Sequence, residues 1–307
     1  MIVVAGEALI DLLVHPDGRL AATPGGGPFN TARTIGRLDA EVAYLGCLSS
    51  DRFGSVLREA LARDGVDLSL AGATDAPTTL AVAELDDRGA ARYRFHTADT
   101  SAPGLSDGAV AAALATRPRA FHLGTLGLVL EPMASALAAG VAHAADDEML
   151  VMVDPNCRPL VIPDRAIYLD RLRAVMARAD IVKVSADDLA YLAPGVAIVA
   201  AARALLDGGP TAVLLTDGGR AVVVLTDAET FEVPVPAVEV VDSVGAGDAF
   251  GGAFLARWIG RGLRRSDLTD PIALRDAVTL AVEVASLTCR RPGADPPRRA
   301  ELTWPPE

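Results

Sequence analysis

The chain has 307 residues, and its 28 Lys+Arg against 40 Asp+Glu give a formal net charge of −12. A surface of that sign repels nucleic-acid backbones and acidic lipids, which argues against nucleic-acid or membrane-surface binding. With 51% hydrophobic and 22% charged residues, the chain has the composition of a protein that buries a large core, which excludes disorder and fits one large α/β domain or two modest ones.

The sequence predicts neither export nor membrane insertion. The first residues lack a basic region and carry acids at Glu7 and Asp11, unlike a secretory signal, and no apolar run reaches bilayer length. Cys47, Cys157 and Cys289 lie far apart with no CxxC pair, which argues against a disulfide framework or a zinc site. We therefore expect a protein of the reducing cytoplasm.

Short runs rich in Val, Ile and Leu alternate with Ala-rich stretches of helical period. Strands are predicted at 2–5, 42–47, 120–123, 150–154, 181–184, 212–216 and 221–226. Helices are predicted at 30–38, 55–64, 132–144, 164–178, 187–192, 199–206, 248–260 and 274–288. Repeated βα units of this kind predict an α/β fold with helices on both faces of a mostly parallel sheet. Because no linker or repeat interrupts the pattern, we expect a single domain spanning residues 1–307.

Two segments depart from the βα pattern. Residues 12–22 contain a His-Pro-Asp-Gly turn, and residues 78–97 contain a charged turn between two alternating runs. Both are typical of hairpins outside the main sheet. We hypothesise that they pair into a small β lid over the carboxyl ends of the strands, where open α/β folds place their ligands.

The strongest local motif is the loop Asp242-Ser243-Val244-Gly245-Ala246-Gly247-Asp248, which opens a helix of small residues. Its glycines let the backbone turn tightly, and the N–H groups at the helix start favour an anion. An aspartate beside a bound anion makes sense as the base that takes the proton of an attacking hydroxyl. An ordinary Asp near a helix start explains these seven residues equally well.

Other phosphate-binding and hydrolytic motifs are missing from the sequence. The single lysine of the chain, Lys183, follows no glycine loop, so the P-loop pattern is absent. The chain has no GxGxxG, HExxH or GxSxG motif either. Hydride transfer and serine hydrolysis therefore lose their usual support.

A second glycine cluster, residues 24–32, opens the first long helix and includes Gly26, Gly27 and Asn30. Glycines allow a polar ligand to approach the backbone, and an Asn amide suits sugar hydroxyls because it both donates and accepts. Taken alone, the cluster fits an ordinary loop with a helix cap. Asp11 can likewise be a turn residue or a carboxylate that binds two hydroxyls.

Together these motifs resemble the PfkB family of ribokinase-like sugar kinases, over essentially the whole chain. Residues 25–32, continuing through Leu45-Gly46 and 51–54, are similar to the family's N-terminal signature, although Asp39 and Ser49 stand where glycine is usual. Residues 242–248 match its C-terminal DTxGAGD signature, with Ser243 for Thr. The resemblance implies a ribokinase-like three-layer sandwich and an ATP-dependent sugar kinase.

The resemblance also implies roles for individual residues. Asp248 would be the catalytic base, the backbone of Gly245, Ala246 and Gly247 the anion hole, and Arg158 a cation for the phosphates. The sugar would lie against Asp11, Gly26, Gly27 and Asn30. ATP would lie against Ser185, Gly247 and the loop that contains Thr216 and Gly218.

Metal contacts are implied with departures from the family pattern. The NxxE motif that organises magnesium appears as Ser185-Ala186-Asp187-Asp188, so only Asp188 keeps an acid, and Mg²⁺ is expected mainly through ATP. Potassium-dependent relatives use positions that match Asp242, Val244, Thr288, Arg291 and Gly293. Activation by K⁺ is therefore one expectation.

The subfamily resemblance is to bacterial fructokinases, through residues 6–12, 154–159 and 288–297. It implies phosphorylation of D-fructose to fructose 6-phosphate. Two alternatives stay open: a 2-keto-3-deoxygluconate kinase, in which Arg92 or Arg94 of the lid would bind the substrate carboxylate, and a catalytically silent sugar or nucleotide sensor. The family also implies a possible homodimer formed through the lid.

Overall fold

The computed structural model describes residues 1–86, 91–144 and 148–303. Its centre is an eight-stranded sheet in the order β14-β13-β12-β11-β10-β9-β1-β4. Six strands are parallel, and β13 and β14 complete one edge as antiparallel strands. The strands are β1 (Ile2–Ala5), β4 (Val42–Leu45), β9 (Ala120–Gly124), β10 (Leu150–Asp154), β11 (Ile181–Ser185), β12 (Ala212–Thr216), β13 (Val222–Thr226) and β14 (Thr230–Val233).

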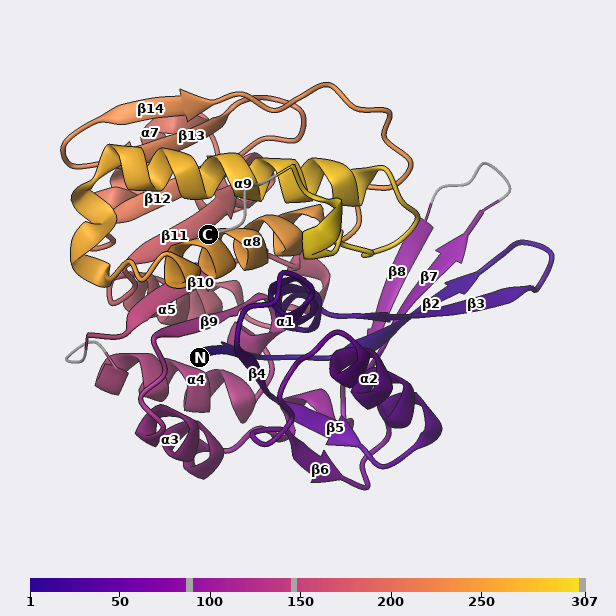
Figure 1. Ribbon diagram of the computed structural model, residues 1–307. Helices are drawn as coiled ribbons and strands as arrows, with labels where there is room; N and C mark the ends of the chain where they lie inside the picture. Colours follow the sequence, from indigo (N-terminus) through magenta and orange to yellow (C-terminus); the bar gives the residue numbers. More distant parts are fainter. Residues whose placement is uncertain (87–90, 145–147, 304–307) are drawn as a thin grey trace.

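Alternate residues of each central strand enter opposite cores, as period-two side chains do in a sheet buried on both faces. Ile2 and Val4 of β1 belong to one cluster, whereas Val3 and Ala5 belong to the other. The first core is completed by α1 (Gly27–Arg37), α2 (Arg52–Arg63), α8 (Ala246–Gly260) and α9 (Pro271–Cys289). The second is completed by α3 (Asp107–Ala115), α4 (Met133–Ala144), α5 (Arg165–Met176), α6 (Ala186–Leu192) and α7 (Ile198–Leu206). The predicted three-layer sandwich is confirmed (Figure 1).

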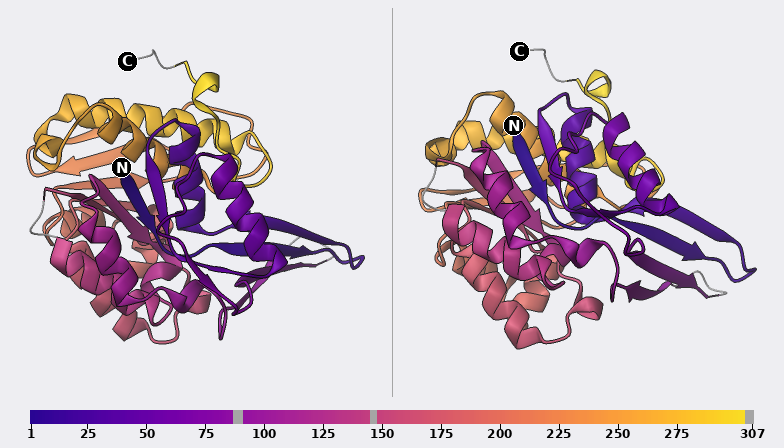
Figure 2. Two further views of the ribbon diagram at one scale, coloured as in Figure 1. Left: turned by 60° about the horizontal axis from the view of Figure 1, so that its bottom comes forward. Right: turned by 90° about the horizontal axis from the view of Figure 1, so that it is seen from below.

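The two segments outside the βα pattern form one four-stranded sheet in the order β3-β2-β7-β8. Its strands are β2 (Leu9–Val14), β3 (Leu20–Gly25), β7 (Leu80–Leu85) and β8 (Ala91–His96). The sheet begins earlier than predicted, so Asp11 lies inside a lid strand and not at the end of β1. Figure 1 shows this sheet projecting from the same end of the body as the loop that leads into α8, and both views of Figure 2 show the β2–β3 hairpin extending past the helices. Part of the predicted turn between β7 and β8, residues 87–90, lies outside the described residues.

Besides the 3-10 turns, four of the elements that the structure describes were not predicted. The predicted strand 42–47 is divided at Gly46 into β4 and β5 (Cys47–Ser49), and β5 pairs with β6 (Gly72–Thr74) in a separate two-stranded sheet. The helix α3 and the edge strand β14 are the others. Five short 3-10 turns complete the described chain: η1 (Ala102–Gly104), η2 (Thr125–Leu128), η3 (Pro159–Val161), η4 (Arg265–Thr269) and η5 (Arg299–Glu301).

All three cysteines are free, and Cys47 and Cys157 are buried. Across the described part of the chain, no helix combines the length and the hydropathy that a membrane span requires.

Candidate active site

The two glycine segments of the sequence meet in space at the carboxyl ends of the strands. The N-terminus of α1 follows Gly26, and the N-terminus of α8 follows Gly245. The two helices pack closely because Gly252 has no side chain: a Cβ there would lie 2.8 Å from the carbonyl oxygen of Thr31. This packing brings together Asn30 and Asp248, which are 218 positions apart, and the Asn30 Nδ2 donates a 2.9 Å hydrogen bond to the Asp248 Oδ2.

Asp248 is a buried carboxyl, 9% exposed, in the first turn of α8. Burial raises its pKa to about 6, since desolvation outweighs the hydrogen bond from Asn30 and the positive charges of Lys183 and Arg158. A carboxylate with that pKa is ionised at neutral pH and accepts a proton more readily than an exposed aspartate. These are the properties required of a general base.

The loop before α8 has the geometry of an anion site. Gly245 is the N-cap in a left-handed conformation with φ 77°, and a Cβ there would lie 2.4 Å from the Cβ of Ala294, so only glycine fits. The Ala246 N–H already donates a long 3.3 Å hydrogen bond to the carbonyl of Ser243. The amides of Gly247 and Asp248 follow in the first turn, where a helix offers N–H groups and the positive end of its dipole.

Two of the predicted sugar-binding residues, Asn30 and Gly27, lie beside Asp248. The Oδ1 of Asn30 is buried without a hydrogen-bond partner, although its Nδ2 is bound to Asp248. An unpaired buried acceptor calls for a donor, and a sugar hydroxyl supplies one. Gly27 leaves space beside the base, because a Cβ there would lie 3.4 Å from the Asp248 Oδ1 and 2.5 Å from the Thr125 Oγ1.

Asp11 and Arg158 lie close enough together for the charge of Arg158 to act on the Asp11 carboxyl. The Asp11 carboxyl lies against Gly25, where a Cβ would stand 2.0 Å from its Oδ2. Burial raises the pKa of Asp11 to about 6, and the charge of Arg158 partly opposes this rise. Arg158 is exposed and bonds through Nη1 to the carbonyls of Asn156 and Cys157 at 3.3 and 3.2 Å. Its charge also acts on Asp248 and Asp154, so Arg158 places a positive charge near the start of α8.

The predicted nucleotide-binding residues lie on neighbouring strand ends. Ser185 of β11 pairs in register with Thr216 of β12. Gly218 has φ 53°, and a Cβ at Gly219 would have no neighbour within 4 Å, so this loop presents open backbone. Ser185 caps α6 with Asp188 in a reciprocal capping box.

Asp188 is fully occupied by the protein. Its Oδ1 accepts from the Cys157 N–H at 2.7 Å, and its Oδ2 accepts from the Ser185 N–H at 2.9 Å and the Ser185 Oγ at 2.6 Å. Within residues 1–86, 91–144 and 148–303, no three His, Cys, Asp or Glu side chains gather as a metal-binding set. The residues therefore fit a magnesium ion that is held by nucleotide phosphates and water.

The residues matched to a monovalent site lie beside the anion loop. Asp242 accepts from the Val244 N–H at 3.0 Å and from the Gly293 N–H at 2.8 Å, which joins the loop to the segment after α9. The Thr288 carbonyl accepts from the Arg291 N–H at 3.1 Å. The structure thus brings these five positions together, whereas their use of K⁺ stays a prediction.

Sequence reasoning missed two buried residues of the site. Glu7 accepts hydrogen bonds from the amides of Gly27 and Gly127, at 3.2 and 3.1 Å. It thereby anchors the loop before α1 that contains the predicted sugar-binding residues, which we call the sugar loop. Lys183 donates a 2.8 Å hydrogen bond to Asp154. The available signal was a charged residue just after an apolar strand, for Glu7, and inside one, for Lys183, because such a residue must find a partner when it is buried.

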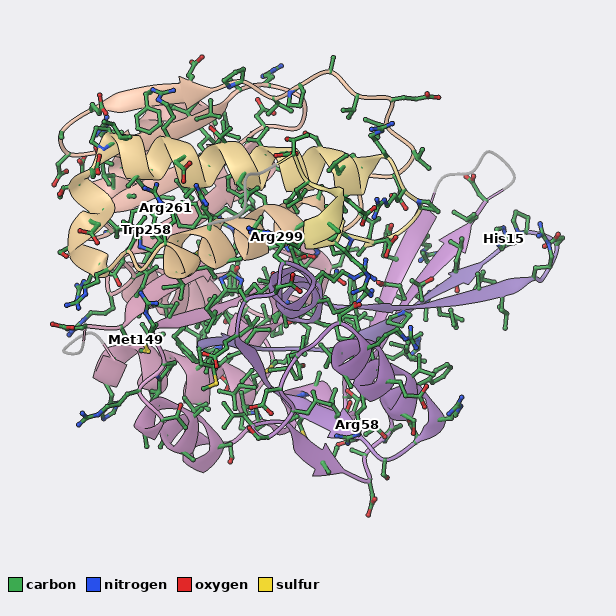
Figure 3. All side chains as sticks on the ribbon, in the orientation of Figure 1. His15, Arg58, Met149, Trp258, Arg261 and Arg299 are labelled. Carbon is green, nitrogen blue, oxygen red and sulfur yellow. The ribbon has the colours of Figure 1, made fainter. Side chains whose placement is uncertain are left out.

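A hollow of about 800 Å³ lies at the other end of the body, against Arg119, Met149 and Leu263. In Figure 3 Met149 and Trp258 mark that end, far from His15 at the outer end of the lid hairpin. The hollow is therefore separate from the candidate active site.

A doubly covered α/β sheet, an anion-binding helix start with an adjacent base, and a β lid define a phosphotransferase of the sugar-kinase type. Comparison with family models gives the same answer, because residues 1–300 match the pfkB family of carbohydrate kinases. The chain belongs to this family and is a carbohydrate kinase.

Relatives with known names agree. Fructokinase-1 of Oryza sativa subsp. japonica is 31% identical over 98% of this chain and 95% of its own length. The crystal structure of a Xylella fastidiosa fructokinase with bound ATP superposes with a TM-score of 0.88 at 30% identity, covering 95% of this chain and 93% of that one. A Vibrio cholerae fructokinase with fructose, ADP and calcium bound gives a TM-score of 0.82 at 25% identity, covering 95% and 94%.

Proposed function

We propose that this protein transfers the γ-phosphoryl group of Mg·ATP to the C6 hydroxyl of D-fructose and so forms fructose 6-phosphate and ADP. The observation that carries the proposal is the Asn30–Asp248 pair at the start of α8: one buried base, one unpaired acceptor and one anion-binding backbone within a single hydrogen-bonded group. The named relatives are fructokinases, which supports this choice of sugar.

In the proposed reaction the sugar lies between Asp11 and Asn30, with its attacking oxygen beside Asp248. Asp248 accepts the hydroxyl proton as the new O–P bond forms, and the bond from the γ-phosphorus to the ADP oxygen breaks. The Gly247 and Asp248 amides and the Arg158 guanidinium stabilise the charge on the transferred group. Bound magnesium would neutralise phosphate charge and would be held by the phosphates and water, because both Asp188 oxygens already accept hydrogen bonds from Cys157 and Ser185.

The geometry of the lid weakens the runner-up, a 2-keto-3-deoxygluconate kinase. Residues paired in register share a face of a sheet, so Asp11, Ala81 and Phe95 point to one side. Leu12, Val82 and Arg94 point to the other, as do Val14, Glu84 and Arg92. Arg92 and Arg94 therefore lie on the face opposite Asp11, and Arg94 is paired with Glu84 at 3.6 Å. Neither can bind the carboxylate of a sugar that contacts Asp11.

ADP release from Mg·ATP tests the proposal against D-fructose, 2-keto-3-deoxygluconate, ribose, tagatose 6-phosphate and adenosine, with and without K⁺. We expect D-fructose to dominate. Dominance of another acceptor would overturn the choice of sugar. Binding of sugar and ATP without any ADP release would overturn catalysis itself and favour the silent sensor.

A further inference from the structure

Lys183 is the only lysine among the 307 residues, and it is 4% exposed in the middle of β11. A buried ammonium is costly unless it is paired. Its partner is Asp154 at the end of β10, whose Oδ2 accepts from the Lys183 Nζ at 2.8 Å. The other Asp154 oxygen is buried without a partner. Packing alone would be served better by an apolar pair, so the charges themselves call for an explanation.

The lysine lies directly beneath the anion loop. A Cβ on Gly247 would stand 2.9 Å from the Lys183 Nζ, so the ammonium is in contact distance of the backbone that precedes Asp248. The absence of a side chain at Gly247 therefore leaves room for the Lys183 ammonium on one side of the loop and for an anion on the other. A buried positive charge this close to an anion site acts through a medium in which solvent screens it weakly.

Charged groups from several elements face this ammonium. Asp154 of β10, Asp188 of α6 and Asp248 of α8 all favour its charged form, and its pKa is raised. From β9 comes His122, whose pKa is lowered to about 4 by burial first and by Lys183 second, so it is neutral at pH 7. Arg158 acts on Asp154 and Asp248 from the exposed side. Among these groups, Lys183 is the buried cation that offsets three buried carboxyls.

We propose that Lys183 is a positioning residue for phosphoryl transfer, which supplies fixed positive charge beneath the anion loop and offsets the negative charge that Asp154 presents to Asp248. This role rests on the proposed function and extends it to a residue that touches neither sugar nor nucleotide. Lys183 lowers the pKa of Asp248 and Asp154 raises it, so the two members of one ion pair act on the base with opposite signs.

A double-mutant cycle of the wild type, Lys183→Met, Asp154→Asn and the double variant tests the proposal. The readout is kcat/KM for fructose against pH at saturating Mg·ATP, where the acid limb reports the base. Lys183→Met should move the limb upward by on the order of one pH unit. Asp154→Asn should move it downward, and the double variant should lie between the two. A merely structural pair would lower activity in all three variants without moving the limb in opposite directions, and that result would overturn the proposal.

Lys183→Met leaves Asp154 buried and unpaired and can fail to fold. The comparison of Asp154→Asn with the double variant then decides, because the two differ only in the lysine charge. The acid limb of kcat/KM should lie at a lower pH in Asp154→Asn than in the double variant. Acid limbs at the same pH in the two variants would overturn the proposal. Thermal unfolding of each variant shows whether it is folded under assay conditions.

The sole lysine also gives a readout that does not depend on turnover. In protein labelled with ¹³C and ¹⁵N at lysine, one side-chain signal is expected, and Lys183→Met or the double variant assigns it. The signal should remain that of an ammonium from pH 6 to 9 and should shift when Mg·ADP is added. A neutral amine, or a signal unchanged by Mg·ADP, would overturn the role of Lys183, whereas a wild-type protein without fructose-dependent ADP release would instead overturn the proposed function.

Discussion

The Asp248 carboxyl accepts a side-chain hydrogen bond from Asn30, and its backbone carbonyl accepts one from Thr31. The Asn30 side chain both holds the Asp248 Oδ2 and lowers the pKa of Asp248, against the larger effect of burial. As the proposed base, Asp248 would work only within a pH window that its surroundings set. Asn30, far from Asp248 in the sequence, is thus one of the residues that set the pKa of Asp248, together with Asp154, Lys183 and Arg158.

The rate should fall as the pH drops through about 6, because a protonated Asp248 cannot accept the hydroxyl proton. Asn30→Ala removes the hydrogen bond that favours the carboxylate, so the acid limb of kcat/KM should move upward and KM for the sugar should rise. Profiles of the two proteins at saturating Mg·ATP check this, since the titration of ATP itself is common to both. A limb that stays in place or moves downward in Asn30→Ala would contradict this account of the base.

The sugar loop at the start of α1 is held by backbone geometry. Gly26 has φ 110°, and a Cβ there would lie 2.7 Å from the carbonyl oxygen of Glu7, an atom that cannot move aside without displacing the strand connection. Gly27, next in the chain, donates to the Glu7 carboxyl. The loop before α1 is thus fixed by the steric restriction at Gly26 and by the hydrogen bond from Gly27 to Glu7.

Gly26→Ala should raise KM for fructose at least about tenfold, the effect of roughly 1.4 kcal/mol, while nucleotide binding stays near that of the wild type. Gly108→Ala in α3 is the matched control, because a Cβ there has no neighbour closer than 4.0 Å and the site is remote. Steady-state kinetics with fructose and calorimetric titration with Mg·ADP separate the two effects. Equal KM values in the two variants would show that the loop does not position the sugar.

The elements of the body could be predicted from the sequence because their apolar periods are unambiguous. All seven predicted strands and all eight predicted helices occur, with shifted ends. α3 was missed because its small residues carry almost no amphipathic period, and β14 because four residues at a sheet edge give too short a pattern. The split at Gly46 depends on a backbone contact to Gly72 that no local pattern contains.

The candidate site was only partly predictable. Asp248, Asn30 and the glycines stand out because their residue types serve polar ligands in loops. The sequence placed Asp11 at a strand end, and the structure places it within the lid. Glu7 and Lys183 remained hidden because their roles arise from tertiary packing under the two glycine segments. The predicted pairing of two chains through the lid, the single-domain division and the cytoplasmic location stay predictions.

At the scale of the whole molecule, the buried acids of the site make the free energy of unfolding depend on pH. Burial raises the pKa of Glu7 to about 8 and those of Asp11 and Asp248 to about 6. In each case the folded chain keeps a proton that the unfolded chain has already released. These three acids should lower the free energy of unfolding as the pH rises from about 4 to 8, whereas buried His122, whose pKa is lowered to about 4, should raise it between about pH 4 and 6.5. The net fall should therefore be clearest from about pH 6.5 to 8, and the curve should level off above that range.

Glu7 should make the largest single contribution to this slope, up to about 5 kcal/mol for a fully buried group with a shift of this size. Glu7→Gln removes the titration and weakens one amide contact, so it should be less stable than the wild type at pH 5 and lose that disadvantage toward pH 8. Urea unfolding of both proteins at pH 5, 6.5 and 8 measures the difference. A constant difference across these pH values would show that Glu7 does not titrate in this range.

The central claim is that Asp248 is the base for phosphorylation of D-fructose at O6. Its most direct test is single-turnover formation of fructose 6-phosphate by the wild type and by Asp248→Asn, with Mg·ADP affinity measured on the same preparations. The account predicts fructose 6-phosphate from the wild type, a rate at least roughly 10²-fold lower in Asp248→Asn, and similar nucleotide affinity. A near-wild-type rate in Asp248→Asn, or a phosphate placed on another hydroxyl, would contradict it.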